Sequence, residues 1–170
     1  MLNSAPRSNN KYKQGLYVPQ KKEKLVKLNE SGGVYYRSGL EEKMMIYLDR
    51  NEKITKWGAE CIKIPYTKKE WKNSDSEMKT TYHNYYPDFY YEIIKEDGSI
   101  RKVVAEVKPL SQTIESKLKH TNPTAKQLKN FEYELKEWNR NLSKWSEMIK
   151  YCENKGMEFI IITEDYLNRR

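Results

Sequence analysis

The longest regular pattern of apolar and polar residues lies between residues 124 and 155. Apolar side chains recur there at alternating intervals of three and four positions, the spacing of one helix face. Thr124 after Pro123 is a suitable helix start, and Gly156 is a suitable stop. The pattern predicts a long amphipathic helix that packs on a sheet, with a partner-helix coiled coil as the less favoured alternative. Its apolar positions are Leu128, Phe131, Leu135, Trp138, Leu142, Trp145, Ile149 and Cys152.

Shorter patterns predict one further helix and several strands. A helix is expected to begin at Ser38, because Ser38 and Glu41 have the spacing of a capping box. The turn at residues 96–99 separates two β-type runs and predicts that they form a hairpin. The expected strands are one within residues 54–65, the hairpin arms Tyr82–Ile94 and Ile100–Lys108, and Met157–Thr163.

The order of these elements predicts the fold class. Residues 67–81 and 109–123 are polar and lack periodicity, so they are interpreted as loops. Helix, strand, hairpin, long helix and strand together predict an α/β fold, with a mixed β-sheet flanked by helices. Residues 34–170 are expected to form this domain, preceded by residues 1–33 as a basic, flexible arm.

The expected arm is basic and poor in large apolar side chains. Such a segment buries too little apolar surface to offset the entropy lost on ordering. It is interpreted as a solubilising tail, or as an arm that lies along DNA phosphates or docks a protein partner. Its basic residues are Arg7, Lys11, Lys13, Lys21, Lys22, Lys24 and Lys27.

The whole chain is also basic, with 32 Lys and Arg against 24 Asp and Glu and a formal charge of +8. This balance favours a polyanionic partner. Its two cysteines match neither a disulfide framework nor a zinc pattern. No stretch approaches the roughly 18 apolar residues of a membrane span, and no apolar signal core is present. The protein is expected to be soluble and intracellular.

Two carboxylates and a lysine fall on the two arms of the predicted hairpin. Asp88 follows Pro87 on the first arm, and Glu106 and Lys108 share one face of the second. Because Pro87 lacks an N–H, a bulge there would turn Asp88 toward Glu106. Two carboxylates suit Mg²⁺ or Mn²⁺, which activates water and neutralises phosphate charge. Lys108 would orient or deprotonate the attacking water, or stabilise the pentacovalent phosphorus.

The competing interpretation is a solvated ion pair. A Glu-x-Lys pair on one strand face is often exposed and contributes little stability. Here apolar residues at 103–105 and at 107 flank the charges, and the hairpin brings them together. Both features favour a functional site. The neighbouring tyrosines are interpreted mostly as strand and core residues, with some free to stack on an unpaired base: Tyr82, Tyr85, Tyr86, Tyr90 and Tyr91.

Residues 86–90 (Tyr-Pro-Asp-Phe-Tyr) and 105–109 (Ala-Glu-Val-Lys-Pro) carry a resemblance to a known family. They resemble the PD-(D/E)xK nuclease superfamily, and more closely the head-completion nucleases of T-even-like tailed phages. The similarity extends over most of residues 34–167. It implies a restriction-endonuclease-like core, metal ligands at Asp88 and Glu106, and a catalytic lysine at Lys108.

The resemblance also implies a catalytic acidic residue on the first helix, which falls on Glu41. The family pattern has Ser-Trp before that residue, whereas this chain has Gly39-Leu40, so Glu42 is an alternative. Three further residues are candidate DNA contacts. Arg37 could bind a phosphate or form a surface ion pair, Gln112 follows the third strand, and Lys144 is interpreted mainly as a solvated charge.

These observations favour a Mg²⁺- or Mn²⁺-dependent DNA endonuclease in phage head completion or in processing of packaged DNA ends. Its expected partners are double-stranded or branched DNA and phage portal or neck proteins. Its expected location is the host cytoplasm during assembly, or the virion. The alternatives are a virion structural or docking protein on a nuclease fold, a junction-resolving nuclease, and the cutting subunit of a heteromeric transposase.

Overall fold

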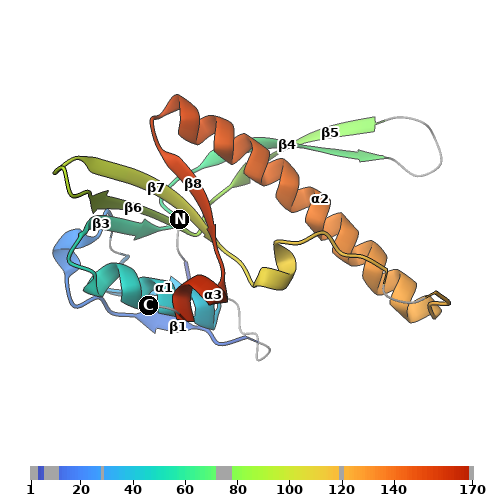
Figure 1. The fold of residues 1–170 in the computed structure, drawn as a ribbon, viewed down its shortest axis with the longest axis horizontal. Helices are drawn as coiled ribbons and strands as arrows, with labels where there is room; N and C mark the ends of the chain where they lie inside the picture. The colour runs from blue at the N-terminus through green and yellow to red at the C-terminus, as the bar shows by residue number, and fades with distance from the viewer. Residues whose placement is uncertain (1–3, 6–11, 28, 72–77, 119–120, 169–170) are drawn as a thin grey trace.

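A four-stranded mixed sheet forms the centre of the computed structural model, which describes residues 4–5, 12–27, 29–71, 78–118 and 121–168. Its strand order is β3-β6-β7-β8, in which β3, β6 and β7 are antiparallel neighbours and β8 runs parallel to β7. Figure 1 shows the sheet between its helices, and the predicted fold class is confirmed. The strands are β3 (Ile54–Ala59), β6 (Phe89–Ile94), β7 (Ile100–Val107) and β8 (Glu158–Ile162).

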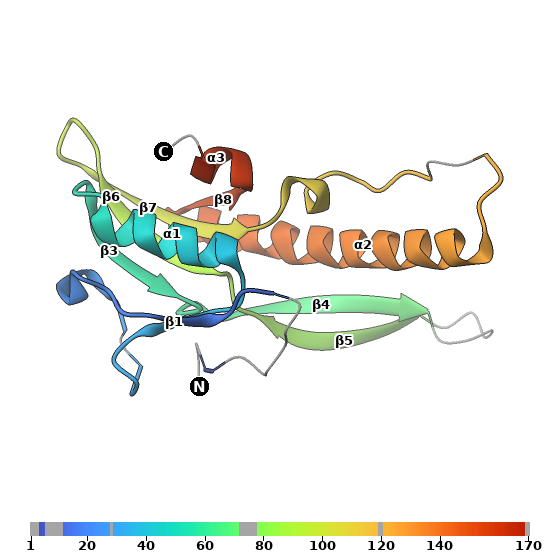
Figure 2. The same cartoon turned by 90° about the horizontal axis from the view of Figure 1, so that it is seen from below.

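Helices cover both faces of this sheet. Helices α1 (Gly39–Arg50) and α3 (Glu164–Asn168) lie on one face, and the long helix α2 (Ala125–Asn154) lies on the other (Figure 2). Consecutive residues of β7 pack into different hydrophobic cores, because the side chains along a strand point alternately to the two faces of the sheet. Val103 and Ala105 pack with α1, whereas Val104 packs with Met148 of α2. Glu106 therefore projects toward the α2 face.

The first helix begins where the sequence predicts. The Ser38 side chain accepts a hydrogen bond from the Glu41 backbone N–H at 3.1 Å. The Glu41 carboxylate in turn accepts from the Arg37 backbone N–H at 2.9 Å. The capping arrangement is thus reciprocal, but its second bond goes to the residue before the cap.

A second hairpin corrects two expectations about residues 64–94. Strands β4 (Ile64–Trp71) and β5 (Met78–Tyr85) form their own antiparallel sheet, so most of the expected loop 67–81 is strand, apart from residues 72–77, which lie outside the described part. The expected strand Tyr82–Ile94 is interrupted at residues 86–88. Thr and Tyr favour strands even where no apolar alternation marks them. The backbone pairing of β4 with β5 therefore left no periodic signal in the sequence.

The long helix is confirmed, but its apolar stripe is only partly covered. Thr124 and Gln127 form a complete capping box at its start, and Gly156 has a φ of +62° past its end. Trp145, Met148 and Cys152 are buried, whereas the N-terminal part extends away from the sheet (Figure 1). The prediction that the whole stripe packs on the sheet is therefore wrong for part of its positions. Leu128, Leu142 and Ile149 are each at least 40% exposed.

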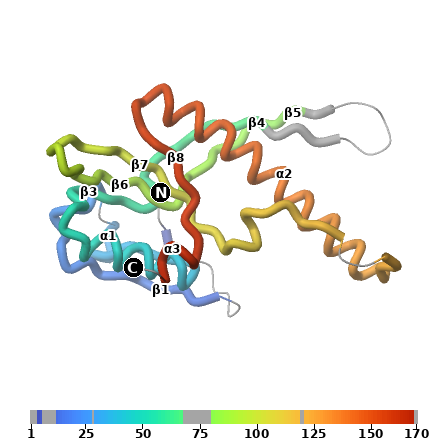
Figure 3. Tube along the Cα trace, viewed as in Figure 1, coloured from blue at the N-terminus to red at the C-terminus, as the bar shows by residue number. Residues whose placement is uncertain are grey.

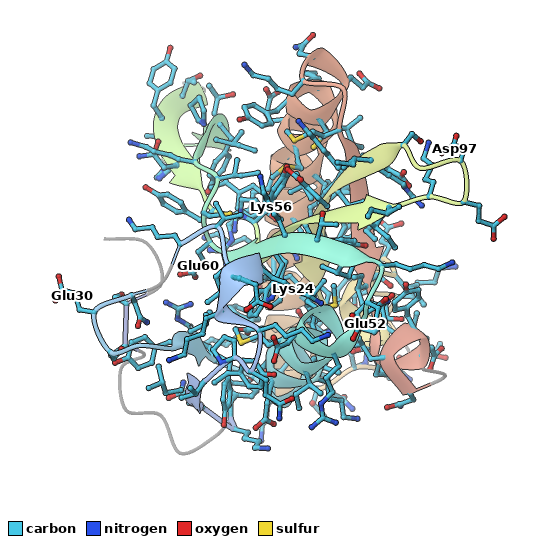
Figure 4. All side chains as sticks on the ribbon, turned by 90° about the vertical axis from the view of Figure 1, so that its left-hand side faces the viewer. Lys24, Glu30, Glu52, Lys56, Glu60 and Asp97 are labelled. Carbon is cyan, nitrogen blue, oxygen red and sulfur yellow. The ribbon has the colours of Figure 1, made fainter. Side chains whose placement is uncertain are left out.

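Residues 12–27 of the N-terminal segment pack on the domain. Strand β1 (Gly15–Tyr17) pairs with β2 (Val34–Tyr36), and a 3₁₀ turn, η1, spans Lys22–Lys24. Figure 3 traces this segment past α1, and Figure 4 shows Lys24 between β3 and α1. The expectation of a flexible arm does not fit these residues, because buried polar contacts hold them. Arg7 and Lys11 lie outside the described residues.

Those contacts centre on Asp49, a fully buried residue of α1. Its carboxylate accepts hydrogen bonds from the Tyr17 hydroxyl at 2.8 Å and from the backbone N–H groups of Gln20 and Lys21 at 2.8 and 3.0 Å. Lys24 Nζ donates to the carbonyls of Asp49 and Asn51 at 3.0 and 2.9 Å. The segment thus supplies a C-terminal cap to α1.

Both cysteines, Cys61 and Cys152, are free thiols. In the described ranges, no helix combines the length and the apolar character that crossing a membrane requires.

Candidate active site

The interruption between β5 and β6 places Asp88 beside β7. Phe89 pairs with Ala105, so the preceding residue, Asp88, lies next to Glu106 across the two strands. The Val107 backbone N–H donates to Asp88 Oδ2 at 2.7 Å, which fixes the carboxylate against the end of β7. Pro87 is buried and has no N–H to pair, so the ladder ends here without an unsatisfied donor. The predicted local break at Pro87 is therefore present, as a change of strand partner.

Glu106 is the most enclosed carboxylate of the site, with 3% of its surface exposed. Lys108 Nζ lies 2.9 Å from Glu106 Oε1. The Tyr85 hydroxyl, from the end of β5, donates to Glu106 Oε2. The hairpin thus brings Glu106 and Lys108 to one face, as the spacing predicts. A buried carboxylate held from two sides is not the solvated surface pair of the competing interpretation.

The charges of the site act strongly on one another. Burial raises the pKa of Asp88 well above its usual range, and the neighbouring Glu106 and Glu41 raise it further. Burial alone lowers the pKa of Lys108, but Glu106 and Asp88 outweigh it, and the net pKa is raised. Lys108 therefore stays protonated between the two carboxylates. Its single charge does not balance the negative charge that gathers here.

Glu41 reaches the site from the first turn of α1. Burial raises its pKa despite the hydrogen bond from the Arg37 backbone, and its charge acts on both Asp88 and Lys108. Its capping role at Ser38 and its place beside the site therefore coexist. The alternative, Glu42, pairs with Lys13 instead.

The donor set fits a hard divalent cation. Asp88 and Glu106 present carboxylate oxygens, and the site has an excess of negative charge for an added cation to balance. Over the described ranges, no three His, Cys, Asp or Glu side chains converge as a ready-made metal cage. Mg²⁺ commonly takes one or two carboxylates and keeps several waters, so two ligands are sufficient.

One of the candidate DNA contacts, Arg37, lies at the edge of the site. Arg37 forms an ion pair with Glu60, so its surface-pair alternative is present in the structure. The Glu60 backbone N–H also donates to the Asp88 carbonyl at 3.0 Å, which connects this pair to the site. Gln112 is exposed in the 3₁₀ turn η2 (Leu110–Gln112), four residues after Lys108.

Lys144 lies closer to the candidate active site than the amino-acid sequence indicates. Its Nζ lies 5.2 Å from the centre of the Tyr85 ring and 6.0 Å from that of Tyr66. Burial and then Arg140 lower its pKa, and Glu106 opposes them. The interpretation of Lys144 as a solvated charge is therefore wrong. Only helical phase relative to Met148 and Cys152, one and two turns further along α2, could have indicated that it faces the sheet.

A mixed sheet between helices, with Asp88, Glu106 and Lys108 at adjoining strand ends, defines a restriction-endonuclease-like nuclease fold of the PD-(D/E)xK type. The chain belongs to the family described as "TnsA-like endonuclease N terminal", whose model matches residues 51–164. It is also 29% identical over 134 residues to the head completion nuclease of Enterobacteria phage T4, a match that covers 79% of this chain and 81% of that protein.

The family match contains the main elements of the site. Asp88, Glu106, Lys108 and Lys144 fall within residues 51–164, whereas Glu41 precedes them. The fold, the nuclease class and the resemblance to phage head-completion nucleases are therefore supported by comparison.

Proposed function

We propose that this protein is a metal-dependent DNA endonuclease that hydrolyses phosphodiester bonds at the Asp88–Glu106–Lys108 site. One observation carries the proposal. Two carboxylates of adjacent strand ends and a half-buried lysine are held together by a 2.9 Å ion pair and a 2.7 Å hydrogen bond. The family match supports the nuclease class, and this geometry supports the assignment of the residues.

Asp88 and Glu106 would hold Mg²⁺ or Mn²⁺. When bound, the ion supplies Lewis acidity toward the scissile phosphate and the attacking water. The chain itself fixes the two ligands, through the Val107 N–H on Asp88 and the Tyr85 hydroxyl on Glu106. Such fixed ligands need no rearrangement when substrate arrives.

Lys108 would act on the reacting water or on the phosphate oxygens. Its raised pKa means that it is protonated at neutral pH, which favours stabilising negative charge over removing a proton. Glu41 would add a third carboxylate beside Asp88 and complete the charge balance with the ion. Arg37 and Gln112 would contact DNA at the margins of the site.

The biological role that we propose is the completion of phage heads or the processing of packaged DNA ends. The similarity to the T4 head completion nuclease, over most of both chains, supports it. Under this role the protein acts in the host cytoplasm during assembly, and portal or neck proteins are its expected partners.

The TnsA-like match supports a second role for the same chemistry. In this alternative the site cuts DNA as the strand-cleaving subunit of a transposase-type assembly. Substrate preference separates the roles. Trimming of free or branched ends favours head completion, a strong preference for four-way junctions favours a resolvase, and cutting only with a partner subunit favours the transposase type.

The direct test uses purified protein and supercoiled plasmid, with linear and branched DNA in parallel. We expect cleavage with Mg²⁺ or Mn²⁺ and none in EDTA. Cleavage that persists in EDTA would contradict the metal requirement. A phage carrying Asp88→Asn that stays infectious would instead support a structural or docking role on a nuclease fold.

A further inference from the structure

We propose that Lys144, held over the rings of Tyr85 and Tyr66, binds a backbone phosphate of the DNA strand being cut, and that Tyr85 connects this phosphate site to Glu106. The inference rests on the proposed nuclease function and adds a binding site on α2. Its ligand class is a phosphodiester or a simple phosphate anion.

Three separate segments build the site. Lys144 comes from α2, Tyr66 from β4 and Tyr85 from the end of β5. The ammonium lies 6.0 Å from the ring centre of Tyr66 and 5.2 Å from that of Tyr85, within the range of a cation–π contact. Both tyrosines are buried, with 8% and 5% of their surfaces exposed, so the rings form a fixed platform. Lys144 is thereby restrained in place.

Lys144 is a cation without a carboxylate of its own among the ion pairs of the described residues. Arg140, one turn earlier on α2, pairs with Glu137, and Lys150 pairs with Glu147. A half-buried ammonium without a paired acid is costly unless an anion completes its surroundings. Among the described side chains none accepts a hydrogen bond from Lys144 Nζ, so its N–H donors can bind such an anion. Lysine binds phosphate in this way, as a point charge.

The anion would lie close to the reacting phosphate. Tyr85 contacts Glu106 through its hydroxyl and Lys144 through its ring, so Lys144 lies at the same end of the sheet as the carboxylates. Phosphates of one strand follow one another at short intervals, so a cation beside the metal ligands is positioned for the phosphate next to the scissile one. Lys144 would thus fix which phosphodiester of the bound DNA strand lies at Asp88 and Glu106.

Tyr85 has two contacts that can be separated by substitution. Its hydroxyl donates to Glu106, and its ring face carries Lys144. Tyr85→Phe removes the first contact and keeps the second, whereas Tyr85→Leu removes both. Tyr85 is a positioning residue in this account, because it acts through Glu106 and Lys144.

The first experiment measures binding of a short DNA duplex in EDTA, where no cleavage occurs, across a series of salt concentrations. We expect Lys144→Ala to weaken binding about three- to tenfold and to reduce the salt slope by about one. Lys150→Ala is the matched control, an exposed lysine of the same helix, and should bind almost as wild type does. Equal affinities and slopes for Lys144→Ala and Lys150→Ala would overturn the proposal.

The second experiment titrates Mn²⁺ into each Tyr85 variant by calorimetry and repeats the DNA binding in EDTA. Tyr85→Phe should weaken Mn²⁺ binding about tenfold while its DNA affinity in EDTA stays at the wild-type value. Tyr85→Leu should weaken both Mn²⁺ binding and DNA binding in EDTA. If Tyr85→Phe and Tyr85→Leu bind DNA equally in EDTA, the ring does not hold Lys144 and the coupling is wrong.

These readouts separate the two claims. DNA binding in EDTA tests Lys144 without any cleavage, so it can fail while the nuclease function stands. Conversely, loss of the nuclease claim through unchanged cleavage by an Asp88 variant would leave the Lys144 result intact. Circular dichroism and thermal unfolding of each variant identify any that fails to fold, and Lys144→Gln then replaces Lys144→Ala.

Discussion

Glu106 at the end of β7 and Lys108 just past it lie on one face, with Nζ 2.9 Å from Oε1, and the intervening Val107 N–H donates to Asp88. Three consecutive residues at the end of β7 therefore organise the centre of the site. Their side chains supply a cation and a carboxylate, and their backbone fixes the second carboxylate. A strand that changes partner at Pro87 makes this arrangement possible, because it brings Asp88 to the edge of β7.

Lys108→Gln should reduce DNA cleavage about 10²- to 10³-fold, because a positioned charge beside the reacting phosphate is lost. Mn²⁺ binding should be retained, since both carboxylates remain. Single-turnover cleavage and calorimetry measure the two effects. Lys102→Gln, an exposed lysine of β7, is the control and should cleave normally. Equal rates for the two variants would remove Lys108 from the mechanism.

Much of this site could be predicted from the sequence, because strand geometry is local. Alternation along 100–108 placed Glu106 and Lys108 on one face, and the 96–99 turn brought Asp88 opposite them. The apolar spacing of α2 predicted its helix in the same way. These features depend on neighbours within a few positions, and a period of two or of 3.6 reports them directly.

Contacts between distant segments could not be predicted. Lys144 joins the site only because α2 crosses the sheet beside β4 and β5, which no local period encodes. The β4–β5 hairpin lacked apolar alternation, and Tyr85 was one tyrosine among fourteen. The N-terminal segment has the composition of a flexible arm, yet one buried carboxylate, Asp49, supplies enough hydrogen-bond partners to order residues 12–27.

Asp49→Ala should lower the free energy of unfolding by about 2–4 kcal/mol, because it leaves the Tyr17 hydroxyl and two backbone N–H groups without their acceptor. Urea denaturation measures the loss, and proteolysis of residues 12–27 should become faster. Glu52→Ala, which removes only an exposed ion pair with Lys21, should change stability little. Similar stabilities for both variants would show that Asp49 does not anchor the segment.

Because the rest of the domain covers only part of α2, substitutions along this helix should differ in how much they lower the free energy of unfolding. Met148 is fully buried, so Met148→Ala should cost about 2–5 kcal/mol of unfolding free energy. Leu128 is 40% exposed, so Leu128→Ala should change it by no more than about 0.5 kcal/mol. Urea denaturation of the two variants checks the prediction. A large loss at Leu128 would mean that the first half of the helix is covered in solution.

The raised pKa of Asp88 predicts how metal-free stability depends on pH. A carboxyl whose pKa is higher in the folded state stabilises the fold below its unfolded pKa of about 3.9, and this contribution is lost as pH rises through the folded pKa. The Asn side chain of Asp88→Asn does not ionise, so the variant does not lose this stability as pH rises. In EDTA, the variant's Tm should therefore exceed that of wild type by more at pH 8 than at pH 5.

Added Mg²⁺ should reverse the difference, so that the wild type has a higher Tm than Asp88→Asn. At about 100 times its Kd, Mg²⁺ should stabilise the wild type by about 2.7 kcal/mol and Asp88→Asn by much less. A Tm difference that does not change with pH or with Mg²⁺ would show that Asp88 bears no unfavourable charge in the fold.

The central claim is that Asp88 and Glu106 are the metal ligands of a DNA-cleaving site. Its most direct test is the rate of plasmid cleavage in Mg²⁺ by wild type, Asp88→Asn and Glu106→Gln, with Glu96→Gln in the exposed β6–β7 turn as control. We predict that the two site variants lose at least about 10³-fold in rate and that Glu96→Gln retains the wild-type rate. Wild-type cleavage by folded Asp88→Asn and Glu106→Gln would contradict the account.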